Sequence, residues 1–60
     1  MPYASGETPV YGDRIKDKQG RQATVRDLLP DDEILIQWDE GVVEMKYPAG
    51  HFTLIARATK

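Results

Sequence analysis

The chain has 60 residues, with eight Lys/Arg against ten Asp/Glu and a formal net charge of −2. This length predicts one small domain with a limited core. The acidic balance argues against nucleic-acid binding by bulk electrostatic attraction, although it allows a local basic patch. With no cysteine and one histidine, we expect no disulfide framework, no metal site and no cofactor.

From the opening residues we expect no secretion signal. The opening residues MPYASGE lack a basic region and an apolar region. No apolar stretch approaches the about 20 residues that a transmembrane helix requires. We therefore expect a cytoplasmic protein without membrane association.

The chain divides into an arm, a domain and a short tail. Residues 1–9 contain prolines, a glycine and small polar residues without apolar periodicity, which predicts a flexible N-terminal arm. The folded domain is expected over residues 10–57. Residues 58–60 are expected to fray.

Two strands are predicted in the first half of the domain. A short strand within residues 12–17 centres on Ile15 and leads into a glycine turn at 18–21. The next strand, residues 22–28, places Ala23 and Val25 on one face. The following Leu-Pro-Asp-Asp predicts a turn.

The strongest predicted strand covers residues 33–38. Ile34, Ile36 and Trp38 recur there with a period of two, which is typical of a half-buried strand. The following Asp39-Glu40-Gly41 predicts a tight hairpin with a positive φ at the glycine.

The last third of the chain predicts two more strands. They cover residues 42–47 and 52–57, with a turn at 48–51 that includes a possible 3₁₀ turn. In the first of these strands, Val43 and Met45 are expected to face inward together with Tyr47.

Turn residues recur about every 8 to 12 positions, which is the spacing of an all-β domain. Closing five short strands into one barrel removes exposed strand edges. The sequence therefore predicts an all-β fold, a small five-stranded SH3-like barrel. The expected core consists of Ile15, Val25, Ile34, Ile36, Trp38, Val43, Met45 and Leu54.

The first half of the domain resembles KOW-type domains. The resemblance rests on Gly-Asp-Arg-Ile-Lys at 12–16, on Gly20-Arg21, and on Ala-Thr-Val at 23–25. The chain has Ala23-Thr24 where those domains usually carry a glycine before the second strand's valine. The resemblance implies an SH3-like barrel with nucleic-acid contacts.

The second half resembles Tudor-like barrels. Ile-Gln-Trp-Asp-Glu-Gly at 36–41 is followed by Tyr47-Pro48 and Leu54-Ile55. The resemblance implies recognition of a cationic ligand, such as a modified lysine or an arginine-rich peptide, beside an aromatic side chain.

A third resemblance is to the type II plasmid-borne dihydrofolate reductases, which are small SH3-like barrels that form a pore from four chains. Their Val-Gln-Ile-Tyr motif is not matched by the comparable segment here, residues 43–48, which reads Val-Glu-Met-Lys-Tyr-Pro. We expect no enzymatic activity. The alternative is a tetrameric reductase that binds NADPH.

Aromatic and acidic residues form the first candidate site. Small barrels often gather aromatic side chains at one rim as a cage or stacking platform. The candidates for this rim are Tyr11, Trp38, Tyr47 and Phe52, with the acidic Asp39 and Glu40 beside them. The alternative is that Trp38 and Phe52 fill the core and that the two carboxylates lie at a solvated hairpin tip.

Basic residues form the second candidate site. The candidates for contact with nucleic-acid phosphates are Arg14, Lys16, Lys18 and Arg21. The alternative is a solvated face, which the net acidic balance favours. His51 has no nucleophile or second histidine to act with, and is interpreted as a surface turn residue.

The combined sequence evidence favours a small binding module that recognises its ligand through rim loops and aromatic residues. We expect a protein or peptide partner rather than nucleic acid. The alternative is a structural accessory protein without a small-molecule ligand, which forms homo-oligomers through Val42, Leu35 and Leu29.

Overall fold

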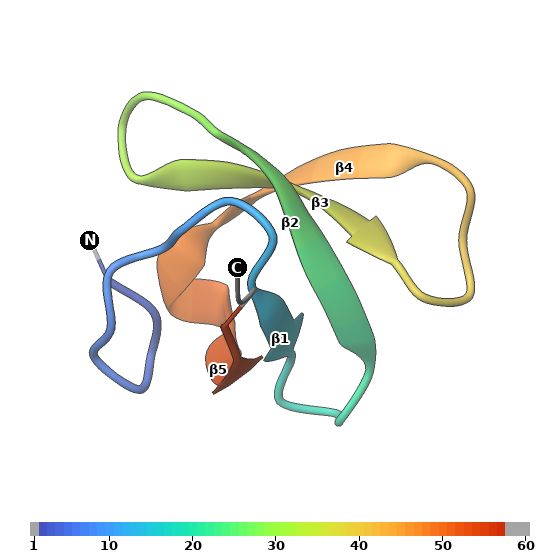
Figure 1. Cartoon of the computed structure of the whole chain (residues 1–60), viewed down its shortest axis with the longest axis horizontal. Coiled ribbons are helices and arrows are strands. Elements are labelled where there is room, and N and C mark those ends of the chain that lie inside the picture. The colour runs from blue at the N-terminus through green and yellow to red at the C-terminus, as the bar shows by residue number, and fades with distance from the viewer. Residues whose placement is uncertain (1, 58–60) are drawn as a thin grey trace.

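In the computed structural model, which describes residues 2–57, the chain folds into one antiparallel sheet of five strands. The strands follow the order β4-β3-β2-β1-β5 in the sheet (Figure 1). The elements are β1 (Arg14–Lys16), β2 (Gln22–Leu28), β3 (Glu33–Trp38), β4 (Glu44–Pro48), the 3₁₀ turn η1 (Ala49–His51) and β5 (Thr53–Ala56). The all-β, five-stranded prediction is confirmed. The fraying expected at residues 58–60 lies outside the described residues.

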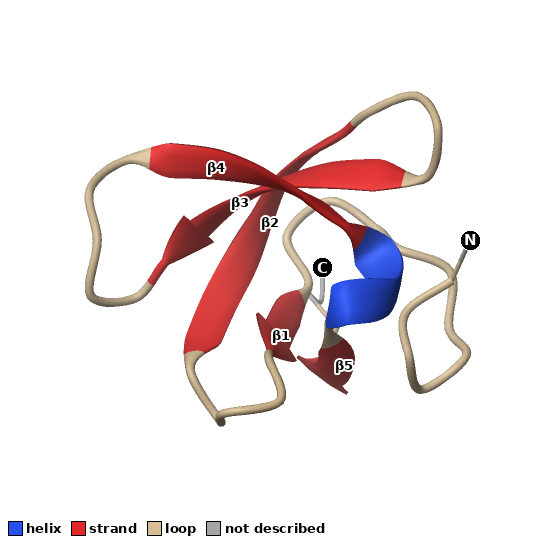
Figure 2. Ribbon diagram, turned by 180° about the vertical axis from the view of Figure 1, so that it is seen from behind, coloured by secondary structure: helices blue, strands red, loops and turns tan. Residues whose placement is uncertain are grey.

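The strand β2 connects the two halves of the sheet. It pairs with β1 on one side and with β3 on the other, and its register with β3 shifts between Val25 and Asp27. Such a bulge bends a strand and increases its twist. Figures 1 and 2 show β2 crossing the molecule, with β3 and β4 towards one end and β1 and β5 towards the other.

The β2–β3 hairpin closes with a tight turn at the predicted place. Asp31 and Asp32 both have φ 63°, and the Glu33 amide donates to the Pro30 carbonyl at 3.4 Å. Two successive positive φ angles define a type I′ turn, whose twist matches that of the flanking strands.

The β3–β4 connection differs from the predicted hairpin. It is a longer loop over residues 39–43, and the glycines with positive φ are Gly6, Gly12 and Gly20. The positive φ predicted for Gly41 is therefore wrong. Gly41 instead donates its amide to the Trp38 carbonyl at 3.0 Å, a local turn that any residue can form.

The core lies on one face of β1, β2 and β3 and is completed from both ends of the chain. The buried apolar residues are Tyr3, Ile15, Ala23, Val25, Ile34, Ile36, Ala49 and Phe52, and Trp38, Tyr47 and Leu54 pack against them partly exposed. Four members of the predicted core, namely Ile15, Val25, Ile34 and Ile36, are confirmed as fully buried.

Two residues of the predicted core are exposed, and the prediction is wrong for both. Val43 is 66% exposed and Met45 is 43% exposed. Val43 lies in the loop before β4. Met45 pairs with Ile36 and so shares its face, but β4 ends the sheet, and among residues 2–57 no strand lies beyond it.

The N-terminal segment differs from the flexible arm that was expected for residues 1–9. Tyr3 is 2% exposed, the Ala4 amide donates to the Phe52 carbonyl at 2.7 Å, and the Leu54 amide donates to Ser5 Oγ at 3.1 Å. A single aromatic side chain anchors this segment, which is why apolar periodicity gave no signal. Met1 lies outside the described residues.

The described residues contain no helix that is long and apolar enough to span a lipid bilayer.

Candidate functional site

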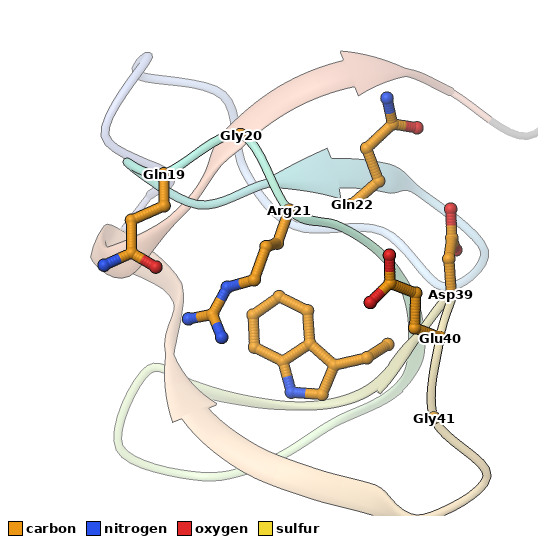
Figure 3. Close-up of a pocket in the computed structure, with 8 residues that line it drawn as sticks. Gln19, Gly20, Arg21, Gln22, Asp39, Glu40 and Gly41 are labelled. Atoms are coloured by element: carbon orange, nitrogen blue, oxygen red, sulfur yellow. The ribbon is translucent and has the colours of Figure 1, made fainter.

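A hollow of about 630 Å³ opens between the β1–β2 turn, residues 17–21, and the β3–β4 loop, residues 39–43. We call it the Trp38 hollow. Figure 3 shows the side chains of Arg21 and Glu40 turned toward it from the two loops. The residues that line it are Gln19, Gly20, Arg21, Gln22, Trp38, Asp39, Glu40 and Gly41.

The buried carboxylate of Asp17 holds the β1–β2 turn in shape. Asp17 Oδ1 accepts the amides of Gln19 and Arg21, both at 2.9 Å, and Oδ2 accepts Arg21 Nε at 2.8 Å. Burial raises the pKa of Asp17, but these hydrogen bonds together with the Arg21 charge outweigh it, and the net pKa is lowered. The carboxylate is therefore ionised at neutral pH, and it fixes the direction of the Arg21 side chain.

The Arg21 guanidinium lies over the indole of Trp38, with 4.9 Å between Arg21 Cζ and the ring centroid. This is the distance of a cation–π contact. The Nε edge of the guanidinium is bound to Asp17, while the side chain is 60% exposed. Arg21 can therefore offer its remaining N–H groups to a ligand that enters the hollow.

Arg14 and Asp39 form one ion pair. The sequence analysis placed Arg14 in the basic candidate site and Asp39 in the aromatic and acidic candidate site. Two parallel hydrogen bonds join Arg14 Nη1 and Nη2 to the carboxylate oxygens of Asp39, at 2.8 and 2.6 Å. Arg14 also donates to Thr24 Oγ1 at 2.6 Å and to Gln22 Oε1 at 3.1 Å. This two-pronged geometry is the strongest form of an Arg–carboxylate contact.

The ion pair changes the charge that each partner can present to a ligand. The hydrogen bonds with Asp39 raise the pKa of Arg14, and the same bonds lower the pKa of Asp39. Both charges are thus compensated within the chain. Glu40 is exposed and has no ion-pair partner within residues 2–57, so it is the uncompensated charge of the hollow.

Four rings pack together at the hollow: Trp38 lines it, and the other three are Tyr47, His51 and Phe52. The ring centroids of Trp38 and Tyr47 are 5.7 Å apart in an edge contact, and those of Trp38 and Phe52 are 5.8 Å apart. Tyr47 and Phe52 also meet edge to face at 5.6 Å. Phe52 is fully buried, so the expectation that it contacts a ligand is wrong. Phe52 instead fills the core, which was the alternative, and it packs against the partly exposed rings of Trp38 and Tyr47.

His51, which was interpreted as a surface turn residue, is exposed in the turn η1, and its ring also belongs to this group. Its imidazole stacks on the Tyr47 ring at 5.3 Å with an interplanar angle of 18°. The 3₁₀ turn η1 turns the chain back so that residue 51 meets residue 47. The sequence indicates this contact through its spacing, because His51 follows Tyr47 by four positions across the turn-forming Pro-Ala-Gly.

The other predicted site residues lie apart from the hollow. Tyr11 is exposed and makes no ring contact within the described part of the chain. Lys16 and Lys18 are exposed and line no part of the hollow. The predicted basic patch is therefore divided, because Arg14 is engaged with Asp39 and Arg21 with Asp17.

Within residues 2–57, no group of three or more acidic or histidine side chains is arranged to hold a metal ion. Comparison with protein-family models, with curated proteins and with solved structures gives no match. Function is therefore inferred from the chemistry of the chain itself.

Proposed function

We propose that this chain is a non-enzymatic binding module that takes a peptide segment with a basic side chain into the Trp38 hollow. The observation that carries the proposal is a partly exposed tryptophan at the hollow, backed by other rings and bordered by the uncompensated carboxylate of Glu40. Tryptophan, tyrosine and arginine are the residue types that most often dominate protein–protein binding energy.

The balance of charge favours a cationic ligand. Arg21 is compensated by Asp17 and Arg14 by Asp39, so Glu40 leaves the lining of the hollow with a formal charge of −1. A basic side chain of a peptide would pair with Glu40. It would reach the indole face by displacing the Arg21 guanidinium, whose cation–π contact of about 0.5–1 kcal/mol at an exposed site it would replace.

A titration monitored by ¹⁵N-HSQC tests the proposal. The probe is a pool of short basic peptides that includes methylated lysine. We expect shifts of the Trp38 indole N–H and of the Glu40 amide, with a Kd in the micromolar range. Glu40→Gln is expected to weaken binding several-fold, because it removes the uncompensated charge without changing the size of the side chain.

The matched control is Asp27→Asn, which removes one exposed carboxylate on β2, away from the hollow. It is expected to leave peptide affinity unchanged. Equal losses for Glu40→Gln and Asp27→Asn would mean that only net charge attracts the peptide, and would contradict a site at Trp38.

Nucleic acid is the second candidate ligand, and one observation favours it. Lys16 and Lys18 are exposed and form no ion pair within the described residues. A parallel titration with short single- and double-stranded nucleic acids would then shift the amides of residues 16–18 and weaken steeply with salt. If these shifts were observed and the peptides caused no chemical-shift changes, nucleic-acid binding would replace the peptide proposal.

A further inference from the structure

The strand β4 leaves one of its two edges without a partner. It pairs with β3 and, within residues 2–57, with no other strand. The exposed apolar side chains beside this edge are Val42, which is 90% exposed, Val43 and Met45. Free edges present unpaired N–H and C=O groups that can pair with another chain.

We propose that the β4 edge binds the β4 edge of a second copy of this chain, antiparallel and centred on Met45. This inference concerns the free strand edge and is independent of the ligand proposed for the Trp38 hollow. Two antiparallel strands related by a two-fold axis form a self-complementary interface, because residue i faces residue j in both directions.

The charges on β4 select this register. With Met45 facing Met45 of the second copy, Glu44 faces Lys46, and Lys46 faces Glu44. Opposite charges on facing residues stabilise a strand pair, and like charges destabilise it. Centring the pair on Glu44 or on Lys46 would instead place two identical charges face to face.

Neighbouring ion pairs extend the same pattern across the sheet. Arg26 Nε lies 3.6 Å from Glu44 Oε2, and Lys46 Nζ lies 3.5 Å from Glu33 Oε1. In the proposed pair, the row Arg26, Glu44, then Lys46 and Glu33 of the second copy alternates in sign. The symmetric row on the other side of the axis does the same.

The flanking residues also match in this register. Val43 faces Tyr47 of the second copy, and Val42 faces Pro48. The exposed apolar side chains of the loop and of the edge strand would thus be covered by apolar neighbours, which removes them from water. One register therefore satisfies both the charges and the apolar residues of the segment 42–48.

A charge-exchange experiment tests the pairing. In the Glu44→Lys variant both facing positions are cationic, and in the Lys46→Glu variant both are anionic. Each variant alone is expected to dimerise at least about tenfold more weakly than the wild type, as measured by sedimentation equilibrium. An equimolar mixture is expected to recover association as a 1:1 heterodimer, identified by native mass spectrometry with one variant isotope-labelled.

The mixture separates pairing between chains from effects within a chain. Each variant also loses an internal ion pair, but mixing cannot restore that loss, so recovery reports the contact between copies. HSQC spectra of the separate variants check that each is folded. Failure of two folded variants to associate when mixed would overturn the proposal, as would a wild-type protein that stays monomeric at millimolar concentration.

A cross-linking experiment gives an independent readout that does not depend on charge. The chain has no cysteine, so Met45→Cys places single thiols opposite each other at the axis, close enough for a disulfide after mild oxidation. The matched control is Ile55→Cys on the other edge strand, β5, because Ile55 and Met45 are both 43% exposed. We expect a covalent dimer from Met45→Cys only, and equal cross-linking of the two variants would overturn the proposed interface.

Discussion

The Tyr3 hydroxyl donates a hydrogen bond of 2.6 Å to Asp13 Oδ2 in the interior of the protein. The Val10 amide donates to the same oxygen at 2.9 Å, and Arg57 Nε lies 3.6 Å from Asp13 Oδ1. Burial raises the pKa of Tyr3, and the bond to Asp13 raises it further, so the hydroxyl stays protonated and able to donate. One buried carboxylate thus connects the N-terminal segment, the start of β1 and the end of β5.

Tyr3→Phe is expected to destabilise the fold, because it leaves the buried Asp13 carboxylate without its hydroxyl donor. Loss of a hydrogen bond to a charged group costs about 1.5–3 kcal/mol. In a domain of this size, that free energy corresponds to a fall in Tm on the order of 10 °C. Thermal unfolding followed by circular dichroism measures it.

The control for this change is Tyr11→Phe, which removes the same hydroxyl from a tyrosine that is exposed. Its effect on the free energy of unfolding is expected to stay within about 0.5 kcal/mol. If Tyr3→Phe were as mild as Tyr11→Phe, the N-terminal segment would not be part of the folded domain.

The Arg14–Asp39 ion pair predicts how stability changes in acid. The hydrogen bonds from Arg14 hold the pKa of Asp39 below its ordinary value of 3.8. The unfolded chain therefore takes up a proton at Asp39 at a higher pH than the folded chain. The stabilisation is complete above about pH 5 and is lost as the pH falls through 3.8 and then through the lowered pKa.

Urea unfolding at a series of pH values measures this dependence. Asp39→Asn is expected to be less stable than the wild type at neutral pH and to lose less stability in acid, because the titrating group is gone. Asp27→Asn removes a carboxylate outside the Arg14 pair and is the control for the loss of one negative charge at neutral pH. Parallel acid profiles for Asp39→Asn and the wild type would show that the pair does not stabilise the fold.

The regular part of the fold was predictable because its signal is local. The alternation of Ile34 and Ile36 fixed the buried face of β3, and the bounds predicted for β2 and β3 are those observed. Proline and two aspartates in succession marked the turn between these strands. Alternation with a period of two indicates which face of a strand is buried. This prediction was correct for β2 and β3, which have a neighbouring strand on both sides.

The same alternation did not predict burial where burial depends on how segments distant in the sequence pack together. Met45 has the alternation of a core residue, but its strand ends the sheet, and no sequence pattern shows that. Tyr3 lies in a segment without apolar alternation, and its burial depends on Asp13 and on Phe52, 49 residues away. For the site, Trp38 and its acidic neighbours line one hollow, and their contact with a ligand stays a prediction, whereas the Arg14–Asp39 pair required the folded geometry.

The β2–β3 turn predicts a difference between two substitutions at one position. Asp31 has φ 63°, a left-handed conformation that asparagine tolerates as well as aspartate does and that a β-branched side chain does not. Asp31→Asn is expected to leave the free energy of unfolding within about 0.5 kcal/mol of the wild type. Asp31→Val is expected to lower it by about 1–2 kcal/mol, as measured by urea unfolding. A tolerated valine would mean that the turn does not have the type I′ geometry.

Asp17→Asn is expected to release Arg21 from Trp38 while the β1–β2 turn keeps its backbone shape. The asparagine oxygen can still accept the amides of Gln19 and Arg21, but its NH₂ group cannot accept Arg21 Nε, because both are donors. The freed guanidinium would leave the indole more accessible, which raises the acrylamide quenching constant of the single tryptophan. Arg21→Ala is expected to raise the constant by a similar amount, and the double variant to add nothing further. An unchanged constant for Asp17→Asn beside a raised constant for Arg21→Ala would show that Asp17 does not hold the guanidinium over the ring.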